Sequence, residues 1–127
     1  MLKILVAGGA GFIGSHLCKR LIEEGNTVYC VDNLITGDKK NVVGLMDHPK
    51  FNYIEHDVTK PLTQIPEVNL IYHLASPASP NKKSVRSYIN FPIETLLVNS
   101  QGTYNLLNLA KEKNARFLFA STSEVYG

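Results

Sequence analysis

The sequence contains no tryptophan and only two cysteines, and none of its apolar runs approaches the length of a membrane-spanning helix. Such a helix needs about 20 apolar residues in succession, so a spanning segment is excluded. Cys18 and Cys30 are too far apart for a Cys-x-x-Cys pair and too few for a disulfide scaffold. We expect both to be buried as small apolar side chains. The four histidines lack the spacing of zinc ligands, so no metal site is predicted.

The chain also lacks a strong charge of either sign. Its 13 basic and 11 acidic residues leave a formal charge of +2, which gives no electrostatic reason to expect nucleic acid or a membrane surface as partner. The 127 residues allow one domain, and their 44% apolar content is enough for a core. The first apolar run leads into glycines rather than a cleavage site, so it is no secretory signal, and a cytoplasmic protein is expected.

Short apolar runs alternate with amphipathic stretches, which is typical of an α/β domain. One helix is predicted after the first run, ending at Gly25, and a long one over residues 93–113 with Gly102 in its interior. Residues 38–49 predict a short helix or turn, and two prolines within residues 76–80 begin an irregular loop. The predicted strands are residues 3–7, 27–31, 51–55, 70–74 and 116–120.

Strands joined by helical crossovers pair in parallel with right-handed connections. The predicted fold class is therefore α/β, a Rossmann-like parallel sheet of strand order 3-2-1-4-5 that is truncated after strand five. Its last strand would expose unpaired backbone groups and apolar surface. We therefore expect self-association through that edge, as a homodimer or a larger assembly.

The segment GGAGFIG follows the first predicted strand and opens the first predicted helix. It fits Gly-x-x-Gly-x-x-Gly through Gly8, Gly11 and Gly14, or Gly-x-Gly-x-x-Gly starting at Gly9. One glycine makes the tight turn, one lets backbone N–H groups approach a diphosphate, and one lets the helix pack against the strand. Glycines also form ordinary turns, so the motif alone does not establish nucleotide binding.

The position of Asp32 strengthens the interpretation of the glycine loop as a dinucleotide site. It follows the second predicted strand, 18 residues after Gly14, where a carboxylate would bond ribose hydroxyls and repel a 2′-phosphate. Asn33 follows it rather than an arginine, which favours NAD over NADP. The simpler alternative is an ordinary turn with a surface aspartate. The register of strand, loop, helix and acid favours dinucleotide binding.

Polar residues end other strands at the edge where ligands bind in open α/β folds. Asp57, beside Val58, would either meet an adenine edge or cap a helix. Ser76 follows the fourth strand. Residues 121–124, Ser-Thr-Ser-Glu, could polarise a substrate carbonyl or alcohol, but by themselves they are better explained as a hydrophilic turn.

Four segments together resemble the extended short-chain dehydrogenase/reductases that act on nucleotide sugars, the NAD-dependent epimerase/dehydratase family. These segments are the glycine loop, DNLITG from Asp32, HLASPASP from His73 and STSEVYG from Ser121. Within that family, the last two are most similar to the branch that decarboxylates UDP-glucuronate, with the dTDP-glucose 4,6-dehydratases as nearest neighbours. The similarity covers nearly the whole chain.

The resemblance implies NAD as a tightly bound cofactor that oxidises a nucleotide sugar, UDP-glucuronate in this branch, at C4 and later returns the hydride. The C4 ketone makes loss of the C5 carboxylate feasible, because the electrons delocalise into an enolate. By resemblance, Thr122 would bond the C4 oxygen, Glu124 would assist the acid/base step at C5, Ser123 would line that pocket, and Asn105 would contact the substrate. The implied cofactor-binding residues are Gly8, Gly11, Phe12, Ile13, Gly14, Asp32, Asn33, Thr36, Gly37, Asp57, Val58, Leu74, Ala75, Ser76 and Asn99.

The chain departs from the family pattern in its tyrosines. Family members use a Tyr-x-x-x-Lys pair, in which lysine lowers the pKa of the tyrosine, and no tyrosine here has a lysine four positions later. We therefore expect residues 1–127 to be the NAD-binding part of a longer enzyme and to be inactive alone. Leu97 and Glu112 replace common basic residues, and residues 81–90 exceed the family pattern, so a 4,6-dehydratase or 4-epimerase remains an alternative.

Two interpretations from other functional classes also remain. A stand-alone dinucleotide-binding module would need no catalytic tyrosine. A purely structural α/β domain with unrelated glycines would bind no NAD. Binding of NAD distinguishes the second of these from the rest.

Overall fold

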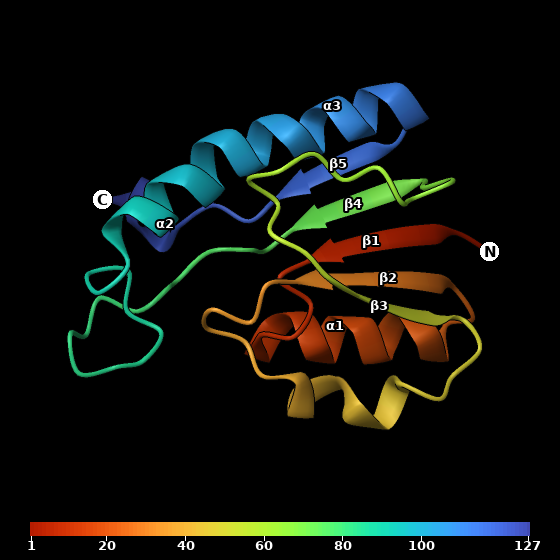
Figure 1. Ribbon diagram of the computed structural model, residues 1–127, viewed down its shortest axis with the longest axis horizontal. Helices are drawn as coiled ribbons and strands as arrows, with labels where there is room; N and C mark the ends of the chain where they lie inside the picture. Colours follow the sequence, from red (N-terminus) through yellow and green to blue (C-terminus); the bar gives the residue numbers. More distant parts are fainter.

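The computed structural model describes residues 1–127, and its five strands form one parallel sheet in the order β3-β2-β1-β4-β5 (Figure 1). The sheet therefore confirms the predicted fold class and strand order. Every arrow points the same way, so all five carboxyl ends meet at one edge. The strands are β1 (Lys3–Ala7), β2 (Thr27–Asp32), β3 (Phe51–Glu55), β4 (Leu70–His73) and β5 (Arg116–Phe119).

Helices cover both faces of the sheet. The helix α1 (Phe12–Glu23) and the 3₁₀ segment η1 (Lys39–Leu45) lie on one face, and α2 (Pro92–Leu97) and α3 (Thr103–Lys113) lie toward the other (Figure 1). Gly25 has φ +86°, so a left-handed glycine ends the first helix where it was predicted to end. A further 3₁₀ turn, η3 (Ser123–Tyr126), follows β5.

The long helix predicted over residues 93–113 is interrupted. A π-helical turn, η2 (Val98–Gly102), joins α2 to α3. Gly102 is part of this turn, and a Cβ there would lie 3.0 Å from Cγ2 of Val58. The glycine therefore permits a close approach between the helix and the loop after β3, which local helix propensity did not predict.

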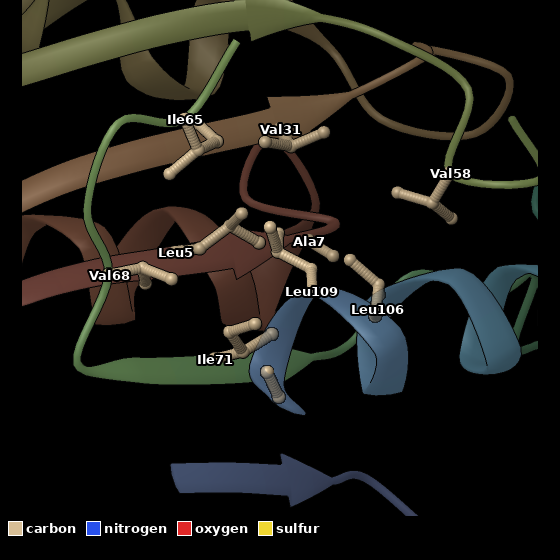
Figure 2. Close-up of a cluster of buried hydrophobic side chains, with 10 residues drawn as sticks. Leu5, Ala7, Val31, Val58, Ile65, Val68, Ile71, Leu106 and Leu109 are labelled. Carbon is tan, nitrogen blue, oxygen red and sulfur yellow. The ribbon is translucent and has the colours of Figure 1, made fainter. Parts of the chain in front are cut away.

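The alternating side chains of the strands feed two separate cores. Leu5 and Ala7 of β1 belong to the core beneath α3, whereas Ile4 and Val6 face α1. Figure 2 shows the first core, where Leu106 and Leu109 of α3 point toward the sheet. Burial of each large apolar side chain contributes about 1.5–3 kcal/mol. These two cores hold the carboxyl edge of the sheet in place from both sides.

Both cysteines are free and buried, as predicted, in the core beneath α1. No helix is long and apolar enough to cross a membrane.

Candidate functional site

A cavity of about 190 Å³ lies at the carboxyl edge of the sheet. The ends of β2 and β3 form one wall of it, and the segment after β4 together with α2 forms the other. Gly8 and Gly11, which follow the central strand β1, lie between these walls. Eleven of the predicted cofactor-binding residues line the cavity: Gly8, Gly11, Asp32, Asn33, Thr36, Gly37, Asp57, Val58, Leu74, Ala75 and Ser76.

The glycines of the loop are needed for two close approaches. Gly8 has φ +82°, and a Cβ there would lie 2.8 Å from the backbone nitrogen of Ala75. A Cβ at Gly14 would overlap the carbonyl oxygen of Gly8. A side chain at either position would therefore separate the loop from β4 or α1 from β1. The loop therefore brings Gly8 and Gly11 to the cavity at the start of α1, the arrangement that binds phosphate groups.

Asp32 is a buried carboxylate that ties two segments together. Its Oδ2 accepts a hydrogen bond of 2.9 Å from the backbone N–H of Ala10, and its Oδ1 accepts one of 2.8 Å from that of Leu34. Each carboxylate oxygen can accept more than one bond, so Asp32 can still receive a hydroxyl in the cavity that it lines. The bond to Ala10 fixes the glycine loop to the end of β2.

Asp57 closes a turn rather than capping a helix. Its Oδ1 accepts hydrogen bonds from the backbone nitrogen of Thr59 at 2.9 Å and from the Thr59 hydroxyl at 2.7 Å. Asn105, predicted to contact substrate, donates from Nδ2 to the carbonyl oxygen of Val58 at 2.9 Å. In this structure Asn105 thus supports the backbone of the cavity wall.

The remaining predicted cofactor-binding residues lie around the cavity rather than in its lining. Phe12 and Ile13 are exposed on the first turn of α1, and Gly14 is buried behind them. Asn99 lies in η2 and donates from Nδ2 to the Ser76 hydroxyl oxygen at 2.9 Å. Asn99 therefore reaches the cavity through Ser76.

The three predicted catalytic residues do not line this cavity. Thr122, Ser123 and Glu124 are exposed after β5, and the Thr122 hydroxyl oxygen accepts a hydrogen bond of 3.3 Å from the backbone N–H of Glu124. They stand at the same edge of the sheet, because β5 pairs in parallel with β4. Their predicted roles remain predictions.

The helical part of one wall of the cavity was not predicted from the sequence. Glu94, Leu97 and Val98 line it from α2 and η2, at positions i, i+3 and i+4 of one helical face. The helical spacing could have identified them once Asn99 was placed near the site. The other unpredicted lining residues are Val31, Ile35, His56, Thr59 and Pro77.

The cavity is lined by three carboxylates and by no lysine or arginine. The acids are Asp32, Asp57 and Glu94. An anionic group would therefore be bound by backbone N–H groups, by the positive end of α1 and by neutral side-chain donors such as Thr36 and Ser76 rather than by a lysine or arginine. The acids would receive hydroxyl or amino groups of the same ligand.

Comparison with known families shows which family has this sequence and fold. Residues 4–127 match the model of the family described as "NAD dependent epimerase/dehydratase family". The chain belongs to this family. The membership accounts for the glycine loop, the buried acid after β2 and the shared edge on which both lie.

Curated members of the NAD dependent epimerase/dehydratase family are similar over nearly the whole chain. It is 51% identical over 126 residues to UDP-glucuronic acid decarboxylase 1 of Arabidopsis thaliana, covering 99% of the chain and 27% of that protein. It is 53% identical over 125 residues to UDP-glucuronic acid decarboxylase 1 of Danio rerio, covering 98% of the chain and 28% of that protein. The chain thus spans little more than a quarter of the length of these relatives.

A solved structure has the same arrangement of the fold. The Bordetella bronchiseptica enzyme WbmH, in complex with NAD+, matches with a TM-score of 0.81 and 26% sequence identity. The match covers the whole of this chain and 41% of that chain.

Proposed function

We propose that residues 1–127 form the NAD-binding part of a nucleotide-sugar-modifying enzyme of the UDP-glucuronate decarboxylase type. The observation that carries the proposal is one cavity that joins the glycine turn to the buried carboxylate of Asp32. A Cβ at Gly8 would meet the backbone of Ala75, and one at Gly14 would meet the carbonyl oxygen of Gly8, so only glycines keep the loop this close to β4 and α1. A glycine loop held in this way beside a buried carboxylate fits a dinucleotide. The identity of 51–53% to decarboxylases supports the substrate class.

Different residues around the cavity would bind different parts of the dinucleotide. The backbone N–H groups of the first turn of α1 would bind the diphosphate, and Asp32 would bind the adenosine ribose. The carboxylate of Asp57 would meet the adenine edge with the oxygen that its turn leaves free. The nicotinamide half would lie against Leu74, Ala75 and Ser76. When bound, NAD would accept a hydride from the substrate and later return it.

The residues after β5 would act on the sugar. Thr122 would bond the C4 oxygen, Ser123 would line the sugar pocket, and Glu124 would move a proton at C5. No Tyr-x-x-x-Lys pair occurs in residues 1–127, so we propose that these residues alone do not turn over substrate. Self-association as a homodimer and a cytoplasmic location remain predictions.

Titration calorimetry with NAD+ and NADP+ tests the cofactor assignment. We expect the chain to bind NAD+ at least about tenfold more tightly, because the Asp32 carboxylate repels a 2′-phosphate. In Asp32→Asn the ratio of the two affinities should shrink, and a ratio cancels any general loss of folding. Absence of NAD+ binding to the folded chain would contradict the proposal and favour a structural domain.

A further inference from the structure

His73, at the end of β4, is 2% exposed and lies beneath the helical layer. Its Nε2 lies 3.0 Å from the hydroxyl oxygen of Thr103, and its Nδ1 has no hydrogen-bond partner. The rings of Phe117 and Phe119 pack against it edge-on, with centroids 6.3 and 5.4 Å away. A buried polar ring with one unpartnered nitrogen is unusual enough to need an explanation.

The proton on the Thr103 hydroxyl determines which nitrogen of His73 carries hydrogen. Thr103 Oγ1 donates to the carbonyl oxygen of Asn99 at 2.9 Å. A hydroxyl has one proton, so toward His73 the same oxygen can only accept. Burial lowers the pKa of His73, against a smaller raising effect of the Val98 carbonyl, so the ring is neutral at pH 7. With the Thr103 proton used in this way, the neutral ring carries its own proton on Nε2.

The bond from Thr103 fixes the π-helical turn that carries Asn99. Asn99 Nδ2 donates two hydrogen bonds of 2.9 Å, one to the carbonyl oxygen of Thr95 and one to the hydroxyl oxygen of Ser76. Ser76 in turn donates to the carbonyl oxygen of Pro77 at 3.0 Å. Asn99 Oδ1 makes no hydrogen bond within the protein. Continuous hydrogen bonds thus connect the buried ring to two residues that line the cavity, Ser76 and Pro77.

We propose that His73 and Thr103 are positioning residues, which hold the turn of η2 so that Asn99 lies against Ser76 at the wall of the cofactor cavity. This inference rests on the proposed function for its purpose, although the positioning itself does not need a bound ligand. The turn that they hold is π-helical, and such turns often occur at functional sites.

The test compares Thr103→Val, which removes the hydroxyl at similar size, with the conservative Thr103→Ser. Long-range ¹H–¹⁵N NMR of the labelled chain reports the tautomer of His73, and the side-chain amide signal of Asn99 reports its contact with Ser76. We expect Nε2–H in the wild type and in Thr103→Ser. In Thr103→Val the tautomers should mix, and the Asn99 signal should move toward that of an exposed amide.

Calorimetry with NAD+ supplies the second measurement. Thr103→Val should weaken binding roughly threefold to tenfold, the range of one lost hydrogen bond, and Thr103→Ser should restore it. Ser100→Ala is the control, because its hydroxyl donates to the Leu96 carbonyl from the same turn and makes no hydrogen bond to His73, Asn99 or Ser76. We expect Ser100→Ala to bind as the wild type does.

Two outcomes would overturn the proposal. One is a wild-type His73 that carries its proton on Nδ1, and the other is a Thr103→Val chain whose Asn99 signal is unchanged. If the wild type does not bind NAD+, the proposed function is wrong, whereas the two NMR signals still decide the positioning.

Discussion

The two halves of the carboxyl edge are built differently. Around β2, Asp32 is buried and both its oxygens accept backbone hydrogen bonds, and the adjoining glycine loop leaves no room for a Cβ at Gly14. After β5, by contrast, Thr122 and Glu124 are exposed, and the bond between them spans 3.3 Å. A site fixed by backbone contacts is rigid without a ligand, whereas an exposed turn depends on what binds to it. The first half is therefore the part of the site that we expect to be preorganised.

Substitution of Gly14 by alanine should cause the largest loss of stability. It tests how tightly the half of the edge around β2 is packed. The new Cβ would overlap the Gly8 carbonyl, so the free energy of unfolding should fall by about 3 kcal/mol. Urea denaturation measures this. Gly44→Ala is the control, because no atom lies within 4 Å of its Cβ position, and it should be neutral or slightly stabilising. Equal stability of the two variants would contradict the close approach.

Asp32→Asn tests the carboxylate that joins the loop to β2. An amide has one acceptor oxygen, so either the Ala10 or the Leu34 N–H would face an NH₂ group, at a cost of about 2 kcal/mol in unfolding free energy. Asp38→Asn should change stability by less than about 0.5 kcal/mol, because exposed Asp38 accepts only from the Lys40 N–H. Chemical denaturation of both variants compares them. Similar losses would mean that the two bonds to Asp32 are not formed.

Burial of His73 at the end of β4 should make the stability of the chain depend on pH. Burial lowers its pKa below the ordinary value of 6.5, so the unfolded chain binds this proton first as pH falls. The stabilisation is therefore complete above pH 6.5 and is lost progressively as pH falls toward the folded-state pKa. Between pH 7 and 5, wild-type stability should fall more steeply than that of His73→Gln. Equal slopes for the wild type and His73→Gln would contradict this contribution of His73.

Thr122→Val should have the smallest effect. Its hydroxyl makes one long bond at an exposed turn, so thermal unfolding should show a change below about 0.5 kcal/mol. A loss above about 1 kcal/mol would remove the contrast between the two halves of the edge.

The sequence was sufficient for features that depend on local pattern. Apolar runs and the turn residues between them predicted the strands to within one residue and the order of the sheet. The glycine spacing and Asp32 predicted part of the cavity, because each stands at the end of a strand and the two strands end at the same edge of the sheet.

Features that depend on contacts between distant segments were missed. The π-helical turn has no periodicity of its own within five residues, and Gly102 looked like a weak point of a helix until its approach to Val58 was seen. The wall formed by Glu94 and Leu97 likewise depends on where the helix docks. Packing between segments decided each of these, and no local propensity encodes it.

The absence of lysine and arginine from the cavity has a consequence for how the chain would hold a charged ligand in solution. Backbone amides carry no net charge and do not titrate. Dissolved salt therefore weakens their hydrogen bonds to a ligand much less than it weakens an ion pair between a ligand and a surface ammonium group. Retention of a dinucleotide should therefore change little with ionic strength, so a concentrated salt wash would not strip it from the protein.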